Sequence, residues 1–164
     1  MRAIILIAHN LRSTHNVGSL LRTAEGLSAD KVILSGYTPY PTHAADVRLP
    51  HESAKIHKHI HKTALGAETS QAWEYVEDIL PVIKQLQKEG WRVAAVEQTP
   101  DAILLPKFHA PEKIALLVGR EVEGVEQEVL GACDSALEIP MFGHKESFNV
   151  VQAAAMALYH CRFM

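Results

Sequence analysis

Three short segments of the sequence combine polar side chains with glycine, and each lies where an apolar run meets a helical pattern. The segments are residues 15–24, 117–125 and 139–149. Their polar groups are amides, guanidinium groups, carboxylates and hydroxyls, which can hold a phosphate or orient a hydroxyl group. Glycine lets the backbone approach a ligand closely because it has no Cβ. Together the three segments favour a ligand site assembled from distant parts of the chain.

Each of these residues also has a purely structural interpretation. Asn16 could be only the N-cap of a helix, and Ser147 could be another cap. Arg22 could lie on a solvated helix face, and Gly119 and Gly124 could be turn residues. Three polar, glycine-bearing junctions in one small chain favour the functional interpretation over five separate structural ones.

The elements that must position these segments follow from the spacing of apolar residues. Short apolar, β-branched runs predict strands at residues 3–7, 31–35, 73–76, 92–96, 114–118 and 136–139. Apolar residues spaced by three and four predict a helix that begins near Asn16, a helix through residues 79–86 with Pro81 in its first turn and Gly90 as its stop, a helix at 127–133, and a long final helix from about Ser147.

Alternating strands and helices predict an α/β domain with a mostly parallel sheet flanked by helices. In such sheets ligands bind at the carboxyl ends of the strands, where the three segments lie. The final helix is apolar on nearly every face because of Val150, Val151 and residues 153–158. A sheet covers only one side of a helix, so a second subunit is the expected cover of the other side, which predicts a homodimer.

Composition bounds the class of protein. The chain has 164 residues, 48% of them apolar and 21% charged, which is enough for one domain with a real core. We therefore expect a single domain over residues 1–164, without an N-terminal RNA-binding extension. No run is long enough to span a membrane and no signal peptide is evident. Cys133 and Cys161 are too few and too far apart for a disulfide framework, which favours a cytoplasmic location.

Charge is nearly balanced overall and uneven locally. The net charge is −3, so there is no global basic surface for nucleic acid. Residues 48–62 nevertheless carry a net charge of +3 and four histidines. The basic residues there are candidates for RNA contacts: Arg48, Lys55, Lys58 and Lys62. His57 and His61 could share a helix face as two metal ligands, but no third ligand is evident and we predict no metal site; a solvated surface is the simpler alternative.

Common nucleotide and hydrolase motifs are absent: the sequence contains no G-x-G-x-x-G, complete Walker motif, H-E-x-x-H, C-x-x-C or G-x-S-x-G. Three other patterns occur instead: N-x-G-x-x-x-R-x-A at 16–24, G-x-E-x-x-G at 119–124, and I-P-M…S-x-N-x-x-x-A at 139–153. In order and spacing the set resembles the three motifs of the SpoU-type (TrmH-like) RNA 2′-O-ribose methyltransferases of the SPOUT class. The resemblance covers essentially the whole chain.

The resemblance implies a C-terminal trefoil knot that binds S-adenosylmethionine, and a homodimer with an active site shared between subunits. Arg22 is then the main catalytic residue. Because arginine stays protonated, a phosphate clamp is physically easier for it than the role of a base. Asn16 holds Arg22 or the ribose, and Glu121 fixes the loop or pairs with a basic group. Ser147 and Asn149 hydrogen-bond near the cofactor and the ribose.

By position, the resemblance also implies the residues around the cofactor. These are Val96, Glu97, Leu117, Val118, Gly119, Ile139, Met141, Ser147 and Phe148. Ile139 and Met141 could instead be ordinary core residues whose backbone makes the contact.

The expected substrate is RNA, with tRNA favoured and rRNA as the other option. Because the net charge is negative, the chain as a whole does not attract RNA. Affinity for RNA must therefore come from a local surface of the catalytic domain, from the dimer or from a helper protein. Two alternatives stay open: a catalytically silent, knot-fold RNA-binding or assembly protein, and a methyltransferase that acts on something other than RNA.

Overall fold

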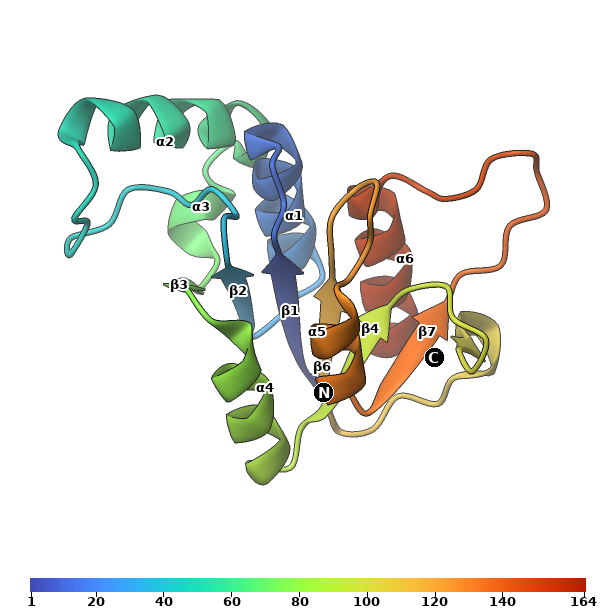
Figure 1. Ribbon diagram of the computed structural model, residues 1–164. Coiled ribbons are helices and arrows are strands. Elements are labelled where there is room, and N and C mark those ends of the chain that lie inside the picture. The colour runs from blue at the N-terminus through green and yellow to red at the C-terminus, as the bar shows by residue number, and fades with distance from the viewer.

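The computed structural model describes residues 1–164, in which seven parallel strands form one sheet (Figure 1). The strands are β1 (Ala3–His9), β2 (Lys31–Ser35), β3 (Trp73–Val76), β4 (Arg92–Val96), β5 (Ile103–Leu104), β6 (Lys113–Val118) and β7 (Ser135–Glu138). Their order across the sheet is β3-β2-β1-β6-β4-β7-β5. The predicted parallel α/β architecture is confirmed.

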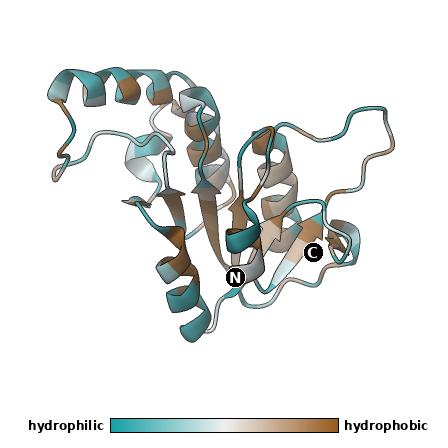
Figure 2. Ribbon diagram, viewed as in Figure 1, coloured by the Kyte–Doolittle hydropathy of each residue, from teal (hydrophilic) through white to brown (hydrophobic).

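Helices cover both faces of this sheet. They are α1 (Thr14–Gly26), α2 (Pro50–Ala64), α3 (Ala67–Ser70), α4 (Ile79–Lys88), α5 (Gln127–Ala132) and α6 (Val150–Phe163), with a 3₁₀ turn, η1 (Leu105–Lys107). Side chains of α1 and α6 pack into one core cluster, and those of α4 and α5 pack into a second cluster on the other face. Because both faces are covered, the central strands are apolar along their length, as Figure 2 shows in brown.

Two predicted helix starts are wrong. Helix α1 begins earlier than expected: Ser13 is its N-cap, and the Ser13 hydroxyl accepts a hydrogen bond from the backbone N–H of Asn16 at 3.1 Å. Helix α6 begins at Val150, and Asn149, rather than Ser147, caps it by accepting from the Val151 N–H at 2.9 Å. The side chain of Asn16 is therefore released from capping, whereas that of Asn149 is committed to it.

Four elements lie outside the sequence predictions: α2, β5 and the short α3 and η1. Strand β5 has only two residues and pairs with β7 at the edge of the sheet. Helix α2 falls in the polar, His-rich segment, where Ile56, Ile60 and Ala64 recur at intervals of four. Ile60 and Ala64 belong to the first core cluster and Ile56 packs against it, which explains how a mostly polar segment forms a stable helix.

Helix α2 lies across α1 at the end of the sheet toward which the strands point (Figure 1). Gly18 makes this close crossing feasible, because a Cβ there would collide with the carbonyl oxygen of Ile60. The Thr63 hydroxyl also donates to the carbonyl of His15 at 2.7 Å. The start of α1 is thus fixed against α2.

Helix α6 buries one face against the sheet and exposes aromatic side chains on another. Ala154, Ala157 and Leu158 are buried, whereas Tyr159 and Phe163 are 58% and 62% exposed. The predicted second subunit over this helix stays a prediction. None of the helices is both long and apolar enough to cross a membrane.

Candidate functional site: a cavity at the carboxyl ends of three strands

A cavity of about 700 Å³ opens at the carboxyl ends of β4, β6 and β7. Its lining comes from three parts of the chain: residues 96–98, residues 118–124 and residues 137–153. Eight of the nine cofactor candidates line it: Val96, Glu97, Val118, Gly119, Ile139, Met141, Ser147 and Phe148. The ninth, Leu117, is fully buried.

The cavity has apolar walls and a few polar groups. Val96, Val118, Leu137 and Ile139 come from the ends of the strands or just beyond them. Charged and polar side chains join them from the loops: Glu97, Gln98, Arg120, Glu121 and Ser147. Nine of its sixteen lining residues are hydrophobic, and a mixture of apolar side chains with placed polar groups is typical of small-molecule sites.

The loop between β6 and α5, residues 119–126, forms one wall and needs both of its glycines. A Cβ on Gly119 would lie 2.7 Å from Val125 Cγ2. Gly124 has a φ of 71°, and a Cβ there would collide with Glu97 Oε2. That carboxylate is fixed because Oε2 accepts from the Val125 N–H at 3.1 Å and Oε1 from the Gln98 N–H at 2.8 Å. The G-x-E-x-x-G spacing is therefore a backbone requirement of this wall.

The same loop is closed by its own bridge. The Gly124 N–H donates to the Arg120 carbonyl at 3.1 Å, and Arg120 Nε donates to the Gly124 carbonyl at 3.1 Å. Arg120 Nε also lies 3.7 Å from Glu126 Oε1. The guanidinium is therefore held at the base of the loop.

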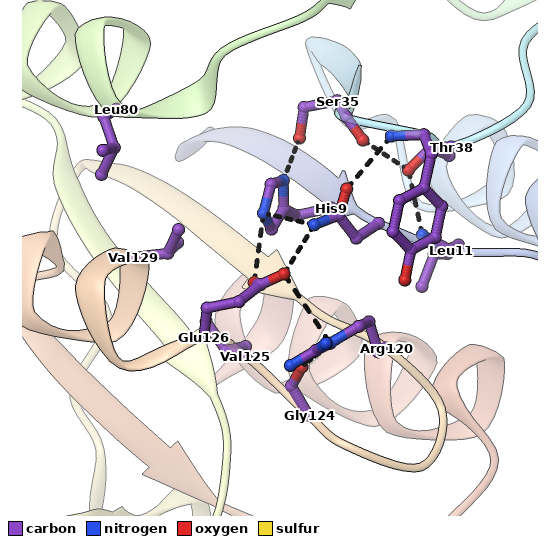
Figure 3. Close-up of polar contacts among 12 residues, drawn as sticks. His9, Leu11, Ser35, Thr38, Leu80, Arg120, Gly124, Val125, Glu126 and Val129 are labelled. Carbon is purple, nitrogen blue, oxygen red and sulfur yellow. Dashed lines mark hydrogen bonds and ion pairs between the residues drawn. The ribbon is translucent and has the colours of Figure 1, made fainter.

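A polar cluster joins this loop to the end of β1, and sequence reasoning missed it (Figure 3). Glu126 Oε1 accepts from Asn10 Nδ2 at 2.6 Å, and Glu126 Oε2 lies 3.2 Å from His9 Nε2. His9 Nδ1 lies 2.9 Å from the Ser35 hydroxyl. Glu126 Oε2 is buried and has no hydrogen-bond partner, so its nearest polar contact is the His9 ring. Polar residues directly after a buried strand, His9 and Asn10, were the available signal.

Burial governs the titration of this cluster. Desolvation lowers the pKa of His9, and the nearby Glu126 carboxylate offsets only part of that effect. Desolvation alone would raise the pKa of Glu126, but hydrogen bonds from its own backbone and from Asn10, with the charges of His9 and Arg120, lower it overall. The favoured state is a neutral imidazole beside an ionised carboxylate.

Two more contacts connect the loop to the start of α1. Asn16 Nδ2 donates to Glu121 Oε1 at 3.1 Å, which brings together two candidate catalytic residues that are 105 positions apart. Arg12 Nη2 lies 4.0 Å from Glu123 Oε1, with both side chains largely exposed. The first contact links the first motif directly to the wall of the cavity.

Arg22 and Asn149 lie apart from that pair. Arg22 is exposed on α1, makes no hydrogen bond or ion pair, and does not line the cavity. Asn149 caps α6 and is also outside the lining. Within one subunit the structure therefore brings together Asn16, Glu121 and Ser147 near the cavity, and leaves Arg22 free.

The four basic RNA-contact candidates divide into two kinds. Lys55, Lys58 and Lys62 are exposed on α2. Arg48 is instead a structural residue: its guanidinium donates to Asp46, to the carbonyls of Tyr40 and Pro41, and to the Ser53 hydroxyl, and it stacks 3.6 Å from the centre of the Tyr40 ring. These partners occupy most of its donors, and the role of Arg48 as an RNA contact stays a prediction.

The histidines of α2 are engaged separately. His57 Nδ1 accepts from the Thr42 N–H at 3.2 Å, whereas His61 Nδ1 pairs with the buried carboxylate of Glu68. No group of three or more His, Cys, Asp or Glu side chains is placed to hold a metal ion.

Comparison with known proteins gives consistent matches. The model of the SpoU rRNA methylase family matches residues 3–159. A Staphylococcus aureus protein named as a TrmH family tRNA/rRNA methyltransferase is 28% identical over 155 residues, which are 94% of this chain and 56% of that protein. The 23S rRNA (guanosine-2'-O-)-methyltransferase RlmB of Ralstonia nicotianae is 27% identical over 157 residues, 95% of this chain and 57% of that protein.

The fold is also found among solved structures. The crystal structure of an AdoMet-bound rRNA methyltransferase from Sinorhizobium meliloti superposes with a TM-score of 0.80 at 18% identity, covering 98% of this chain and 56% of that one. The chain thus spans a little over half the length of the relatives that it matches.

Proposed function

Because this chain belongs to the SpoU methylase family, we propose that it is an S-adenosylmethionine-dependent RNA 2′-O-ribose methyltransferase. The observation that carries the proposal is the cavity, whose wall is the G-x-E-x-x-G loop and whose rim joins Asn16 through Glu121. The AdoMet bound to the Sinorhizobium meliloti relative and the 2'-O-guanosine activity in the name of the Ralstonia nicotianae relative support it.

The residues of the cavity fit this cofactor. The valine and isoleucine walls suit a planar purine, and Gly119 removes the Cβ that would block approach to the backbone at the end of β6. Val96, Val118, Ile139 and Met141 would hold the adenine and ribose. Ser147 and Phe148 would close the cavity from the segment before α6. S-adenosylmethionine supplies an activated methyl group, so the protein has mainly to position the nucleophile.

The side chains at the rim would orient the RNA ribose. Asn16, freed from capping by Ser13, can donate and accept hydrogen bonds, and Glu121 fixes its orientation. Arg22 would clamp an RNA phosphate bidentately beside the reacting 2′-hydroxyl. The hydroxyl proton would leave to that phosphate or to solvent, since a guanidinium is not a base. Asn149 would act indirectly, by fixing the start of α6.

A homodimer would complete this site. Arg22 is exposed, makes no contact within its own subunit and lies outside the cavity lining. The exposed Tyr159 and Phe163 of α6 offer an aromatic face for a second copy. A shared site in which Arg22 serves the cavity of the other subunit accounts for both observations. Threading of the C-terminal segment into a trefoil knot belongs to the same proposal.

The RNA would lie along α2, which packs against the start of α1 and carries the exposed Lys55, Lys58 and Lys62. We favour tRNA over rRNA as the substrate, with a helper protein supplying recognition if these lysines do not suffice. Cys133 and Cys161 are both free thiols, in keeping with a cytoplasmic enzyme.

The test is methyl transfer from labelled S-adenosylmethionine to total cellular RNA, followed by digestion and identification of nucleosides by mass. A new 2′-O-methylated nucleoside supports the proposal and identifies the base. A methyl group on a base overturns the ribose assignment. Cofactor binding without transfer to any RNA favours the silent binding protein, and transfer to a protein or small molecule favours the non-RNA alternative.

The role of Arg22 has its own test. Arg22→Ala should abolish methyl transfer and leave affinity for S-adenosylhomocysteine within a few-fold, because Arg22 does not line the cavity. The exposed Lys84→Ala on α4 is the matched control and should keep full activity. Loss of cofactor binding in Arg22→Ala would show that Arg22 has a structural role instead.

A further inference from the structure

We propose that Arg120 binds a phosphate of the RNA substrate at the rim of the cavity. The inference rests on the proposed function and adds a binding residue that the three motifs do not specify, since Arg120 occupies an x position of G-x-E-x-x-G.

The guanidinium of Arg120 is anchored on one side and free on the other. Its Nε donates to the Gly124 carbonyl at 3.1 Å and lies 3.7 Å from Glu126 Oε1. Neither terminal nitrogen donates a hydrogen bond within the protein, and the side chain is 27% exposed and lines the cavity. Four of its five N–H donors are therefore available, in the planar arrangement that matches two oxygens of a phosphate.

The anchor is itself rigidly held. Glu126 accepts from Asn10 at 2.6 Å and pairs with His9 at 3.2 Å, and Asn10 Oδ1 accepts from the Tyr37 N–H at 3.1 Å (Figure 3). Because the loop and its arginine are fixed before a ligand arrives, little side-chain entropy remains to be lost on binding. This distinguishes Arg120 from the unattached lysines of α2.

The position of Arg120 favours RNA phosphate over the carboxylate of the cofactor. Its partners Glu126, Asn10 and His9 all lie toward β1, the strand that leads into α1. The next residue, Glu121, contacts Asn16, and the adjacent His15 ring lies 6.4 Å from that of His59 on α2. An RNA strand that follows α2 to Asn16 therefore reaches Arg120 next.

The test measures RNA affinity as a function of salt. Dissociation constants of unfractionated tRNA are determined from about 50 to 300 mM KCl for wild type, Arg120→Gln, Arg120→Lys and the control Lys84→Gln. Loss of one phosphate contact should reduce the slope of log K against log[salt] by about 0.7–0.9. We expect that reduction in Arg120→Gln, a slope close to wild type in Arg120→Lys, and no change in Lys84→Gln.

Cofactor binding tests whether Arg120 instead contacts the carboxylate of the cofactor. Affinities for S-adenosylhomocysteine, which has a carboxylate, and 5′-methylthioadenosine, which lacks it, should both be unchanged in Arg120→Gln. Weaker binding of S-adenosylhomocysteine alone would overturn the proposal in favour of a cofactor carboxylate contact. The proposal would also be overturned if the wild-type protein methylates RNA and the Arg120→Gln variant has the same salt slope as wild type. A wild-type protein that neither binds nor methylates RNA would overturn the proposed function itself.

Discussion

The carboxyl edge of the sheet has two neighbouring regions that are built in opposite ways. Strands β1 to β3 follow one another toward one edge of the sheet, and β6 begins the half that extends toward the other edge. At the carboxyl ends of β1 and β6, where these two halves meet, His9, Asn10 and Glu126 are joined by hydrogen bonds. Next to it, at the carboxyl ends of β6, β4 and β7, lies the cavity of about 700 Å³. In open α/β sheets the ligand crevice is expected at the point of reversal. Here that point is closed and the neighbouring one is open.

The difference shows how one loop serves two purposes. In the loop 119–126, Gly119 and Gly124 line the cavity. Glu126, at the end of the same loop, contacts Asn10 at the end of β1. A partly buried polar cluster held by several hydrogen bonds resists movement, because each lost partner leaves a desolvated group behind. The hydrogen-bonded region therefore fixes the position of the loop, and the opposite side of the same loop forms a wall of the cavity. If this division is correct, variants in the two regions should separate cofactor affinity from stability.

The largest effect on cofactor affinity is expected from Gly124→Ala in the open region. Alanine at a φ of 71° costs about 1–2 kcal/mol, and its Cβ would displace a Glu97 carboxylate that two backbone N–H groups hold. Since about 1.4 kcal/mol corresponds to tenfold in affinity, we expect S-adenosylhomocysteine to bind about 5- to 30-fold more weakly. Calorimetric titration measures this.

The matched control for that variant is Gly131→Ala. Gly131 lies in α5 with an ordinary φ, and a Cβ added there would meet no other atom within 4 Å. Alanine there should leave affinity unchanged and stabilise the helix by about 0.5–1 kcal/mol. Equal affinities of Gly124→Ala and wild type would show that the wall of the cavity tolerates rearrangement.

The next effect is expected from Glu126→Ala in the closed region. Asn10 Nδ2 and His9 Nε2 lose their carboxylate partner, so the free energy of unfolding should fall by about 1–3 kcal/mol. Chemical denaturation measures this, with Glu128→Ala, an exposed residue in the first turn of α5, as the control. A loss of cofactor affinity as large as that of Gly124→Ala would show that the two regions act as one site.

Most of the fold is predictable from sequence because it depends on local periodicity. Five of the predicted strands lie within one residue of their observed bounds, since runs such as Lys31–Ser35 are apolar on both faces. Helix α2 escapes prediction because Lys and His dominate it, although Ile56, Ile60 and Ala64 carry its spacing. Strand β5 has two residues and is set by its pairing with β7, which no local pattern encodes.

The parts of the site that come from strand ends and from the three motifs are predictable from the sequence. Five of the eight lining candidates lie within the three motifs. The other three, Val96, Glu97 and Val118, lie at or next to the ends of predicted strands, so local patterns locate them as well. Contacts such as Asn10–Glu126, 116 positions apart, depend on how β1 and β6 pair and are invisible in a single sequence. For the same reason the sequence alone leaves Asn16 as a candidate cap, because only the structure shows that Ser13 takes that role.

The smallest effect is a pH dependence that belongs to the closed region alone. Burial lowers the pKa of His9 below 6.5, its value in the unfolded chain, with Glu126, Arg120 and Asp78 as the charged groups around it. As pH falls below 6.5, the unfolded chain binds a proton that the folded cluster resists, so the free energy of unfolding should decrease between about pH 7.5 and 5.5. Denaturation curves across that range should be flatter for His9→Gln than for wild type, and unchanged for the exposed His109→Gln. Identical slopes for wild type and His9→Gln would mean that the cluster accepts the imidazolium as readily as water does, and that the region between β1 and β6 is less closed than its hydrogen bonds imply.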